Sequence, residues 1–292
     1  MGVRPRLAYM RWNMGMRYGA SRSAALIPLL MSLVTWAAAQ VSDISNVDLC
    51  NGSIGTSLEL QIQGCTALIQ LLENPKALAI AYNNRGNAYS RNGDYEQAVK
   101  DYDEAIKLNA NDAKALNNRG VAYQKKANYD RAIENFDSAI AIDPNYADAF
   151  ANRAETYEKK GDYQKASKDF DQAIQLDPKL TVLGNERCWA RALAGDLREA
   201  TADCNEAIRL NPNDAAAFDS RGFTSLKLGQ WKLAIADYDL ALRINPKLPS
   251  ALYGRGFAKL KSGNLAGGNA DIDAAKAVDK NIVEEFVNYG LH

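Results

Sequence analysis

Histidine is almost absent from the sequence, and this scarcity excludes several kinds of site. The only histidine among 292 residues is His292, the last one. A Ser-His-Asp triad and a histidine metal centre are therefore excluded as internal sites. The sequence also lacks a CxxC pair, a P-loop, a calcium loop, a glycine-rich dinucleotide motif and a G-x-S-x-G turn. We expect no catalytic residue, no metal site and no cofactor.

An excess of charge of either sign is missing as well, because 35 Lys and Arg balance 35 Asp and Glu. Residues 1–39 nevertheless hold five arginines and no acid, which leaves residues 40–292 with a net charge of about −5. This mildly acidic body lacks the clustered basic side chains that bind a phosphate backbone. Nucleic acid is therefore not an expected partner.

The basic start leads into an apolar stretch, residues 24–36, followed by Ala37-Ala38-Ala39-Gln40. A charged region, a short apolar core and an A-x-A site are the three parts of a secretory signal peptide. The competing interpretation is a membrane anchor, but residues 24–39 would span only about 24 Å as a helix, less than a bilayer core of roughly 30 Å. We expect residues 1–39 to be removed and the mature chain to begin near Gln40, in the periplasm or outside the cell.

Most of the remaining chain repeats at a period of 34 residues. Each repeat has a small residue in its first half. In its second half, two further small residues lie seven positions apart, with a large residue between them. The second of these two is Ala105, Ala139, Ala173, Ala207, Ala241 and Ala275. The frame gives six units, 79–112, 113–146, 147–180, 181–214, 215–248 and 249–282. Within a unit, the apolar spacing predicts two amphipathic helices joined by a tight turn. One such hairpin cannot bury its own apolar stripe, so the hairpins must stack.

This pattern resembles the tetratricopeptide repeat, which combines W-x2-L-G-x2-Y, A-x3-F and a proline at a period of 34. The resemblance covers residues 79–282 and implies an all-α, right-handed superhelical solenoid of antiparallel helix hairpins that binds partners in a concave groove. We expect residues 40–78 to form a degenerate capping hairpin, and residues 283–292 to end a closing helix that buries Ile282, Val283, Phe286 and Val287.

One departure from the family is an arginine before the early glycine, within an Asn-Arg-Gly phrase similar to exported bacterial repeat proteins. We expect its stem to lie on apolar surface with its charged head in water. Aspartates two residues apart on the second helices do not face one another. We expect these pairs to be solvated or arginine-paired, with no catalytic or metal role. The arginines are Arg85, Arg119, Arg153, Arg187, Arg221 and Arg255, and the acid pairs include Asp101/Asp103 and Asp169/Asp171.

Two sets of side chains are candidates for the groove. Asn84, Asn118 and Asn152 share one position in three successive first helices, and a primary amide matches both the N–H and the C=O of an extended peptide. The alternative is a repeated hydrogen bond between helices. Asn87 is the first member of a second register, a position that recurs in all six units, and the last three units carry an aromatic side chain there. These aromatic side chains either bind a partner or add packing. This register continues with Val121, Glu155, Trp189, Phe223 and Phe257.

Four cysteines complete the candidate sites. Cys188 and Cys204 lie level across the turn of their predicted hairpin, where the two Cα atoms could come within the 4.4–6.8 Å that a disulfide requires. The same argument pairs Cys50 with Cys65, and export permits both bonds. The alternative is four buried thiols that act as small hydrophobic side chains.

We predict from these features a non-catalytic scaffold that holds a protein or an extended peptide in the periplasm or outside the cell. The runner-up is an enzyme, or a regulatory subunit of an envelope enzyme complex. An acid or a lysine with a perturbed pKa in a deep pocket would favour the enzyme interpretation. A third possibility is a structural module that self-assembles, which light scattering would distinguish from a monomeric binder.

Overall fold

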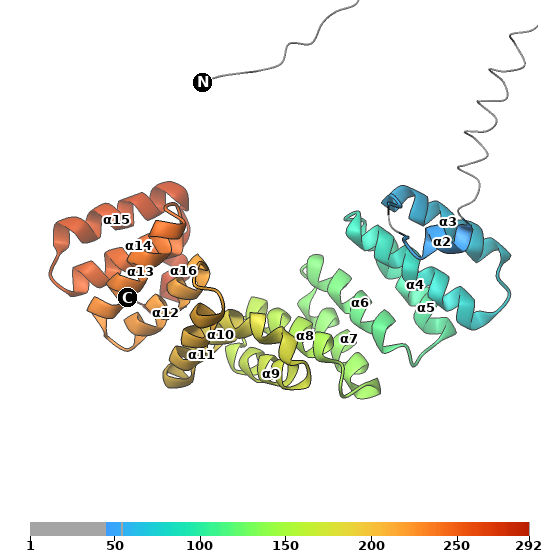
Figure 1. Cartoon of the computed structure of the whole chain (residues 1–292), viewed down its shortest axis with the longest axis horizontal. Helices are drawn as coiled ribbons and strands as arrows, with labels where there is room; N and C mark the ends of the chain where they lie inside the picture. Colours follow the sequence, from blue (N-terminus) through green and yellow to red (C-terminus); the bar gives the residue numbers. More distant parts are fainter. Residues whose placement is uncertain (1–44, 54, 292) are drawn as a thin grey trace, which may run out of the picture. The chain divides into compact units, whose positions relative to one another are not determined.

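Figure 1 shows the protein as a computed structural model, which describes residues 45–53 and 55–291. Those residues form α-helices, one 3-10 segment and no strand, and the helices follow one another as a solenoid of hairpins. The predicted all-α repeat fold is therefore confirmed. The expected signal peptide, residues 1–39, lies outside the described residues.

Six helix pairs make up the array. Within each pair the helices pack together, and each second helix also packs on the first helix of the next pair. The apolar stripe of one hairpin is thus covered by its neighbours, as a solenoid requires. The pairs are α4 (Pro75–Arg91) with α5 (Tyr95–Leu108), α6 (Ala113–Lys125) with α7 (Tyr129–Ile142), α8 (Ala147–Lys160) with α9 (Tyr163–Leu176), α10 (Gly184–Ala194) with α11 (Leu197–Leu210), α12 (Ala215–Lys227) with α13 (Trp231–Ile244), and α14 (Pro249–Lys261) with α15 (Leu265–Val278).

Two first helices begin away from the start of their expected units. Helix α4 begins at Pro75, ahead of residue 79, because the Asn74 side chain caps it by accepting from two backbone N–H groups. The 3-10 segment η1 (Pro178–Leu183) runs from the end of the third unit into the fourth and delays the start of α10 to Gly184. Proline favours the first position of a helical segment, so Pro178 both ends the preceding unit and opens η1.

The core of a hairpin forms where a small residue of the first helix meets a large side chain of the second. A Cβ placed on Gly120 would lie 2.6 Å from the ring of Phe136, which is fully buried. Gly86 faces Tyr102 in the same way, with a corresponding distance of 2.7 Å. Since these distances are too short for any side chain, the close approach of the two helices requires glycine at both positions.

The arginine before this glycine connects three helices from two units, and we call the arrangement the arginine clamp. Arg153 on α8 donates from Nε and Nη2 to the two carboxylate oxygens of Asp169 on α9, at 2.7 and 2.8 Å. Its Nη1 donates to Asp137 on α7, in the preceding unit. Asp169 is only 6% exposed. The clamp therefore combines a buried bidentate ion pair with a bond between units.

The clamp recurs in all six units, with small changes of partner. The arginine side chains are 17–26% exposed, so their heads are paired and do not lie in water as expected. In the pairs Asp101/Asp103, Asp169/Asp171 and Asp237/Asp239, the two acids serve arginines of two successive units. The partners in the same unit are Asp101, Asn135, Asp169, Asp203, Asp237 and Asp271, and those in the preceding unit are Thr66, Asp103, Asp137, Asp171, Asn205 and Asp239.

Further helices flank the array at both ends. Helices α2 (Asn46–Cys50) and α3 (Leu58–Leu71) pack together, and α3 packs on α4. At the other end, α16 (Ile282–Asn288) packs on α14 and α15, with Ile282 2% and Phe286 1% exposed. Val287, expected to be buried with them, is 43% exposed. It lies about 100° around the helix from Phe286, beyond the narrow face that a helix of two turns buries.

Candidate functional site

A polar hollow lies on the first helices near the N-terminal end of the array, and we call it the amide hollow. Its volume is about 440 Å³, and it extends from the N-terminal hairpin of α2 and α3 to α6. Asn84, Asn87 and Asn118, which we predicted to bind a partner, all line it. The other lining residues are Asn51, Gln61, Ser90, Arg91, Tyr102 and Val121. Amide, hydroxyl and guanidinium groups therefore dominate its wall.

Asn118 and Asn152 each hydrogen-bond to the first helix of the preceding unit, and Asn84 bonds to the turn after α2. Asn118 donates from Nδ2 to Oδ1 of Asn83 at 3.2 Å and to Oδ1 of Asn87 at 3.0 Å. Such bonds between helices are the alternative that the sequence left open. A binding role for these asparagines stays a prediction. Asn152 donates to Asn117 at 2.9 Å, and Asn84 donates to Asn51 at 3.2 Å.

Asn87 is held by two donors at its carbonyl oxygen. Its Oδ1 accepts from the Tyr102 hydroxyl at 2.8 Å as well as from Asn118. Burial raises the pKa of Tyr102, so the hydroxyl stays protonated and acts as the donor. Because both lone pairs of Oδ1 are used, the Nδ2 group of Asn87 is the part that can donate to a ligand.

The last two aromatic positions of the same register are buried, and the C-terminal helix packs on the first of them. Phe223 is 0% and Phe257 8% exposed. The ring centroid of Phe286, on α16, lies 5.9 Å from that of Phe223. Of the two roles that the sequence left open for the aromatic side chains, the burial of Phe223 and Phe257 favours packing. Trp189 is half-buried, and its ring lies 4.7 Å from Phe223.

A second hollow, of about 420 Å³, lies beside Trp189, and we call it the acidic hollow. Its wall combines three glutamates and one lysine with three aromatic rings. Of these residues, only Trp189 was a candidate from the sequence. Glu155 and Glu186 share the repeat positions of Asn87 and Asn84, which could have pointed to them. Glu158, Tyr163 and Tyr289 were missed, since no register singles them out. The lining residues are Glu155, Glu158, Lys159, Tyr163, Glu186, Trp189 and Tyr289.

The carboxylates of the acidic hollow are partly desolvated and repel one another. Burial, together with Glu186 and Glu155, raises the pKa of Glu158 to about 7. The pKa of Glu186 is also raised, chiefly by burial. The Oε2 atom of Glu186 is buried, and no donor among the described residues hydrogen-bonds to it. The hollow therefore presents negative charge that its own wall does not fully neutralise.

Comparison with known families decides the identity of the fold. A family model described as tetratricopeptide repeat matches residues 79–112, 113–146 and 147–180, and a second, described as TPR repeat, matches residues 225–263. The chain is a tetratricopeptide repeat protein. The family that the 34-residue period predicted is thus confirmed. No curated protein matches the chain.

Solved structures of other tetratricopeptide proteins share this fold. YrrB, described as a TPR protein with an unusual peptide-binding site, is 25% identical, with a TM-score of 0.60 over 66% of this chain and 98% of its own. PilW, described as a widely conserved type IV pilus biogenesis factor, is 20% identical, with a TM-score of 0.59 over 68% and 93%. A tetratricopeptide repeat protein from Parabacteroides merdae is 18% identical, with a TM-score of 0.59 over 80% and 93%.

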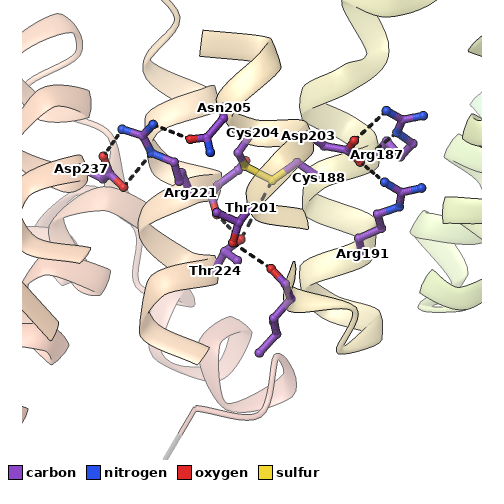
Figure 2. The surroundings of a disulfide bond; sticks show 12 residues. Arg187, Cys188, Arg191, Thr201, Asp203, Cys204, Asn205, Arg221, Thr224 and Asp237 are labelled. Atoms are coloured by element: carbon purple, nitrogen blue, oxygen red, sulfur yellow. Dashed lines mark hydrogen bonds and ion pairs between the residues drawn. A yellow bond between two sulfur atoms is a disulfide. The ribbon is translucent and has the colours of Figure 1, made fainter. Parts of the chain in front are cut away.

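Two disulfides cross-link helices in this tetratricopeptide protein. Cys50–Cys65 joins α2 to α3, and Cys188–Cys204 joins α10 to α11, with Cα–Cα distances of 4.5 and 5.4 Å. All four cysteines are at most 1% exposed. Figure 2 shows the second bond between the helices of the fourth unit, beside the pairing of Arg187 and Arg191 with Asp203. The bond occupies the place that a small residue and a large apolar side chain take in the other units.

Thiol chemistry tests these bonds. Titration of the unfolded, unreduced protein should find no free thiol, and four reactive thiols would refute the pairing. Replacing Cys188 and Cys204 together by alanine should lower the free energy of unfolding by about 3 kcal/mol, the chain-entropy value for a loop of this size. Chemical denaturation of the variant beside the oxidised and the reduced protein gives the comparison. Equal stability of all three would show that the bond does not constrain the unfolded chain.

Within residues 45–53 and 55–291, no group of His, Cys, Asp and Glu side chains is arranged to hold a metal ion. No helix in this part of the chain is both long and apolar enough to cross a membrane.

Proposed function

We propose that the protein is a non-catalytic scaffold that grips an extended polypeptide against its first helices. The amide hollow is the observation that best supports this function, because its wall extends over the hairpin of α2 and α3, α4 and α6. Primary amides donate and accept hydrogen bonds, so they match the N–H and C=O groups of an extended backbone. A wall of amides on successive helices suits a ligand that runs across the helices.

The likeness to YrrB supports the same function. That protein is described as having an unusual peptide-binding site, and nearly its whole length is matched. The disulfides and the sequence of residues 1–39 support a location in the periplasm or outside a bacterial cell, because oxidising compartments maintain such bonds. The scaffold would therefore meet its partner after export.

The alternative of an enzyme, or of a subunit that regulates one, has one observation in its favour. The pKa of Glu158 is raised to about 7, in the range where a general acid or base works. A pair of catalytic carboxylates, however, needs environments that push the two pKa values apart. Here the pKa of the neighbouring Glu186 is raised as well. This common direction favours binding over acid–base catalysis.

Replacing Asn84, Asn118 and Asn152 by alanine tests the scaffold function. The affinity for the tightest peptide selected from a random library on the unchanged protein should fall by about 1–3 kcal/mol, because each net hydrogen bond contributes about 0.5–1.5 kcal/mol. The melting temperature should change little, since alanine is the better helix former and offsets the lost bonds between helices. Calorimetric titration beside thermal melts measures both quantities.

A matched control and a contrary outcome complete this test. Asn111→Ala, in the exposed loop after α5, should leave peptide affinity and melting unchanged. A triple variant that melts earlier but binds the peptide as tightly as the unchanged protein would end the binding role of the asparagines. Their amides would then act only as ties between helices.

A further inference from the structure

The acidic hollow lies apart from the amide hollow, and no residue lines both. Its wall comes from α8, the start of α9, α10 and the residue that follows α16. Its volume of about 420 Å³ is nearly that of the amide hollow. The two hollows lie on first helices of successive units, so one extended ligand could reach both.

Charge indicates what this hollow accepts. Glu155, Glu158 and Glu186 contribute three carboxylates, and Lys159 is the one cation among the lining residues. Lys159 is exposed, whereas the glutamates are half-buried. Because the Oε2 atom of Glu186 is buried without a hydrogen-bond donor from the described residues, one acceptor is available to a ligand. A buried acceptor is stabilised when a donor, above all a charged one, reaches it.

The aromatic part of the wall suits the same ligand. Tyr163, Trp189 and Tyr289 contribute three rings beside the carboxylates. The ring of Tyr289 meets that of Trp189 edge-on, with 5.3 Å between the centroids, and Phe223 packs against Trp189 as well. These contacts hold the indole in place. Aromatic faces attract cations, and a planar guanidinium both stacks on a ring and bonds to carboxylates.

We propose that the acidic hollow binds an arginine side chain of the polypeptide that the scaffold holds. The inference rests on the proposed function and adds the chemical class of one recognised side chain. The guanidinium donates to Glu186 and to its neighbouring carboxylates, and its plane lies against the aromatic wall. The hollow thus selects partners by charge, while the amide hollow binds the backbone of any sequence.

The test uses a blocked heptapeptide of alanine and serine with a central arginine, and the same peptide with citrulline, which keeps the shape but lacks the charge. Trp231→Phe leaves Trp189 as the one tryptophan of residues 40–292, so its fluorescence reports on the acidic hollow. The arginine peptide should bind about ten-fold more tightly than the citrulline peptide. The difference should shrink at high salt, because ions screen the attraction.

Glu186→Gln, in the Trp231→Phe background, is the decisive variant. It should weaken binding of the arginine peptide about ten-fold and leave the citrulline peptide unchanged. Glu199→Gln, on the exposed face of α11, is the matched control and should alter neither affinity. Equal affinity for the two peptides, an unchanged response in Glu186→Gln, or no saturable signal from the arginine peptide would each overturn the proposal.

The dependence on pH gives an independent readout. Glu158 faces Glu155, Glu186, Tyr163 and Tyr289, with Lys159 beside it. A bound guanidinium favours ionised Glu158, so affinity for the arginine peptide should fall as the pH drops from 8 to 6, through the pKa of about 7. Glu158→Gln should flatten this dependence, and an unflattened curve would contradict it.

The failure of this proposal can be told apart from that of the scaffold function. If Glu186→Gln binds the arginine peptide as tightly as the Trp231→Phe protein while the asparagine triple variant loses the library-selected peptide, the scaffold function stands and the arginine site does not. If the triple variant keeps that peptide and Glu186→Gln loses the arginine peptide, the arginine site stands without the amide hollow.

Discussion

Arg153→Ala should lower the free energy of unfolding by about 3 kcal/mol, the low end of the cost of breaking a buried ion pair from one side. The substitution leaves Asp169, 6% exposed, without the two hydrogen bonds that it accepts from the guanidinium. It also removes the bond to Asp137, which joins this unit to the preceding one. Most of the loss comes from the desolvated carboxylate, because an unpaired buried charge is the costly species.

Chemical denaturation followed by helical circular dichroism measures the effect. Lys160→Ala is the matched control, since its partner Asp130 has a side chain that is 79% exposed. That change should stay within about 0.5 kcal/mol, as exposed ion pairs contribute little. If Arg153→Ala is no less stable than the control, the clamp does not hold the units together. Arg153→Ala/Asp169→Asn should recover part of the loss, because the buried charge is then removed.

The clamp could be predicted from the sequence in kind but not in detail. An arginine and a pair of acids recur at the period of the repeat, and residues two apart on a helix point in different directions. These facts indicate pairing, yet which acid meets which arginine depends on how far one hairpin is offset along the next. The structure shows that Asp101 serves Arg85 in its own unit, whereas Asp103 serves Arg119 in the next.

The amide side chains show a second limit of the sequence. From the sequence, Asn118 was expected to face a bound partner, and in the structure it lines the amide hollow. However, an asparagine at this position of the helix can hydrogen-bond either to a ligand or to a neighbouring helix. The sequence therefore could not decide between them, and the structure shows the bond to the preceding helix.

The C-terminal helix was the least predictable part of the candidate site. The i, i+4 spacing of Ile282 and Phe286 predicted a short helix with one buried face. No internal repeat sets where that helix docks, because it follows the last unit. Its contacts extend back to Phe223 and Trp189, in the fifth and fourth units. This docking covers Phe223 and also adds Tyr289 to the acidic hollow.

Phe286→Ala should detach α16 from the array. Phe286 is 1% exposed, and its ring lies 4.6 Å from Tyr253 and 5.9 Å from Phe223. Losing a buried phenylalanine costs about 3–5 kcal/mol, which exceeds what a helix of seven residues can retain by itself. The loss should therefore appear as local opening, with the six hairpins still folded.

Hydrogen exchange resolved along the chain gives the direct measurement of this opening. In Phe286→Ala, the amides of residues 282–291 should exchange at nearly the unfolded rate, while those of α8 keep their protection. In the Trp231→Phe background, Trp189 fluorescence should shift to the red as Tyr289 leaves its ring. The arginine peptide should bind more weakly because the acidic hollow loses one wall. Val287→Ala, at a position 43% exposed, removes apolar atoms from the same helix without uncovering its core face and should change none of these readouts. Persistent protection of residues 282–291 in Phe286→Ala would mean that the remaining contacts hold α16 in place, above all the bond from Lys227 Nζ to the backbone oxygen of Tyr289.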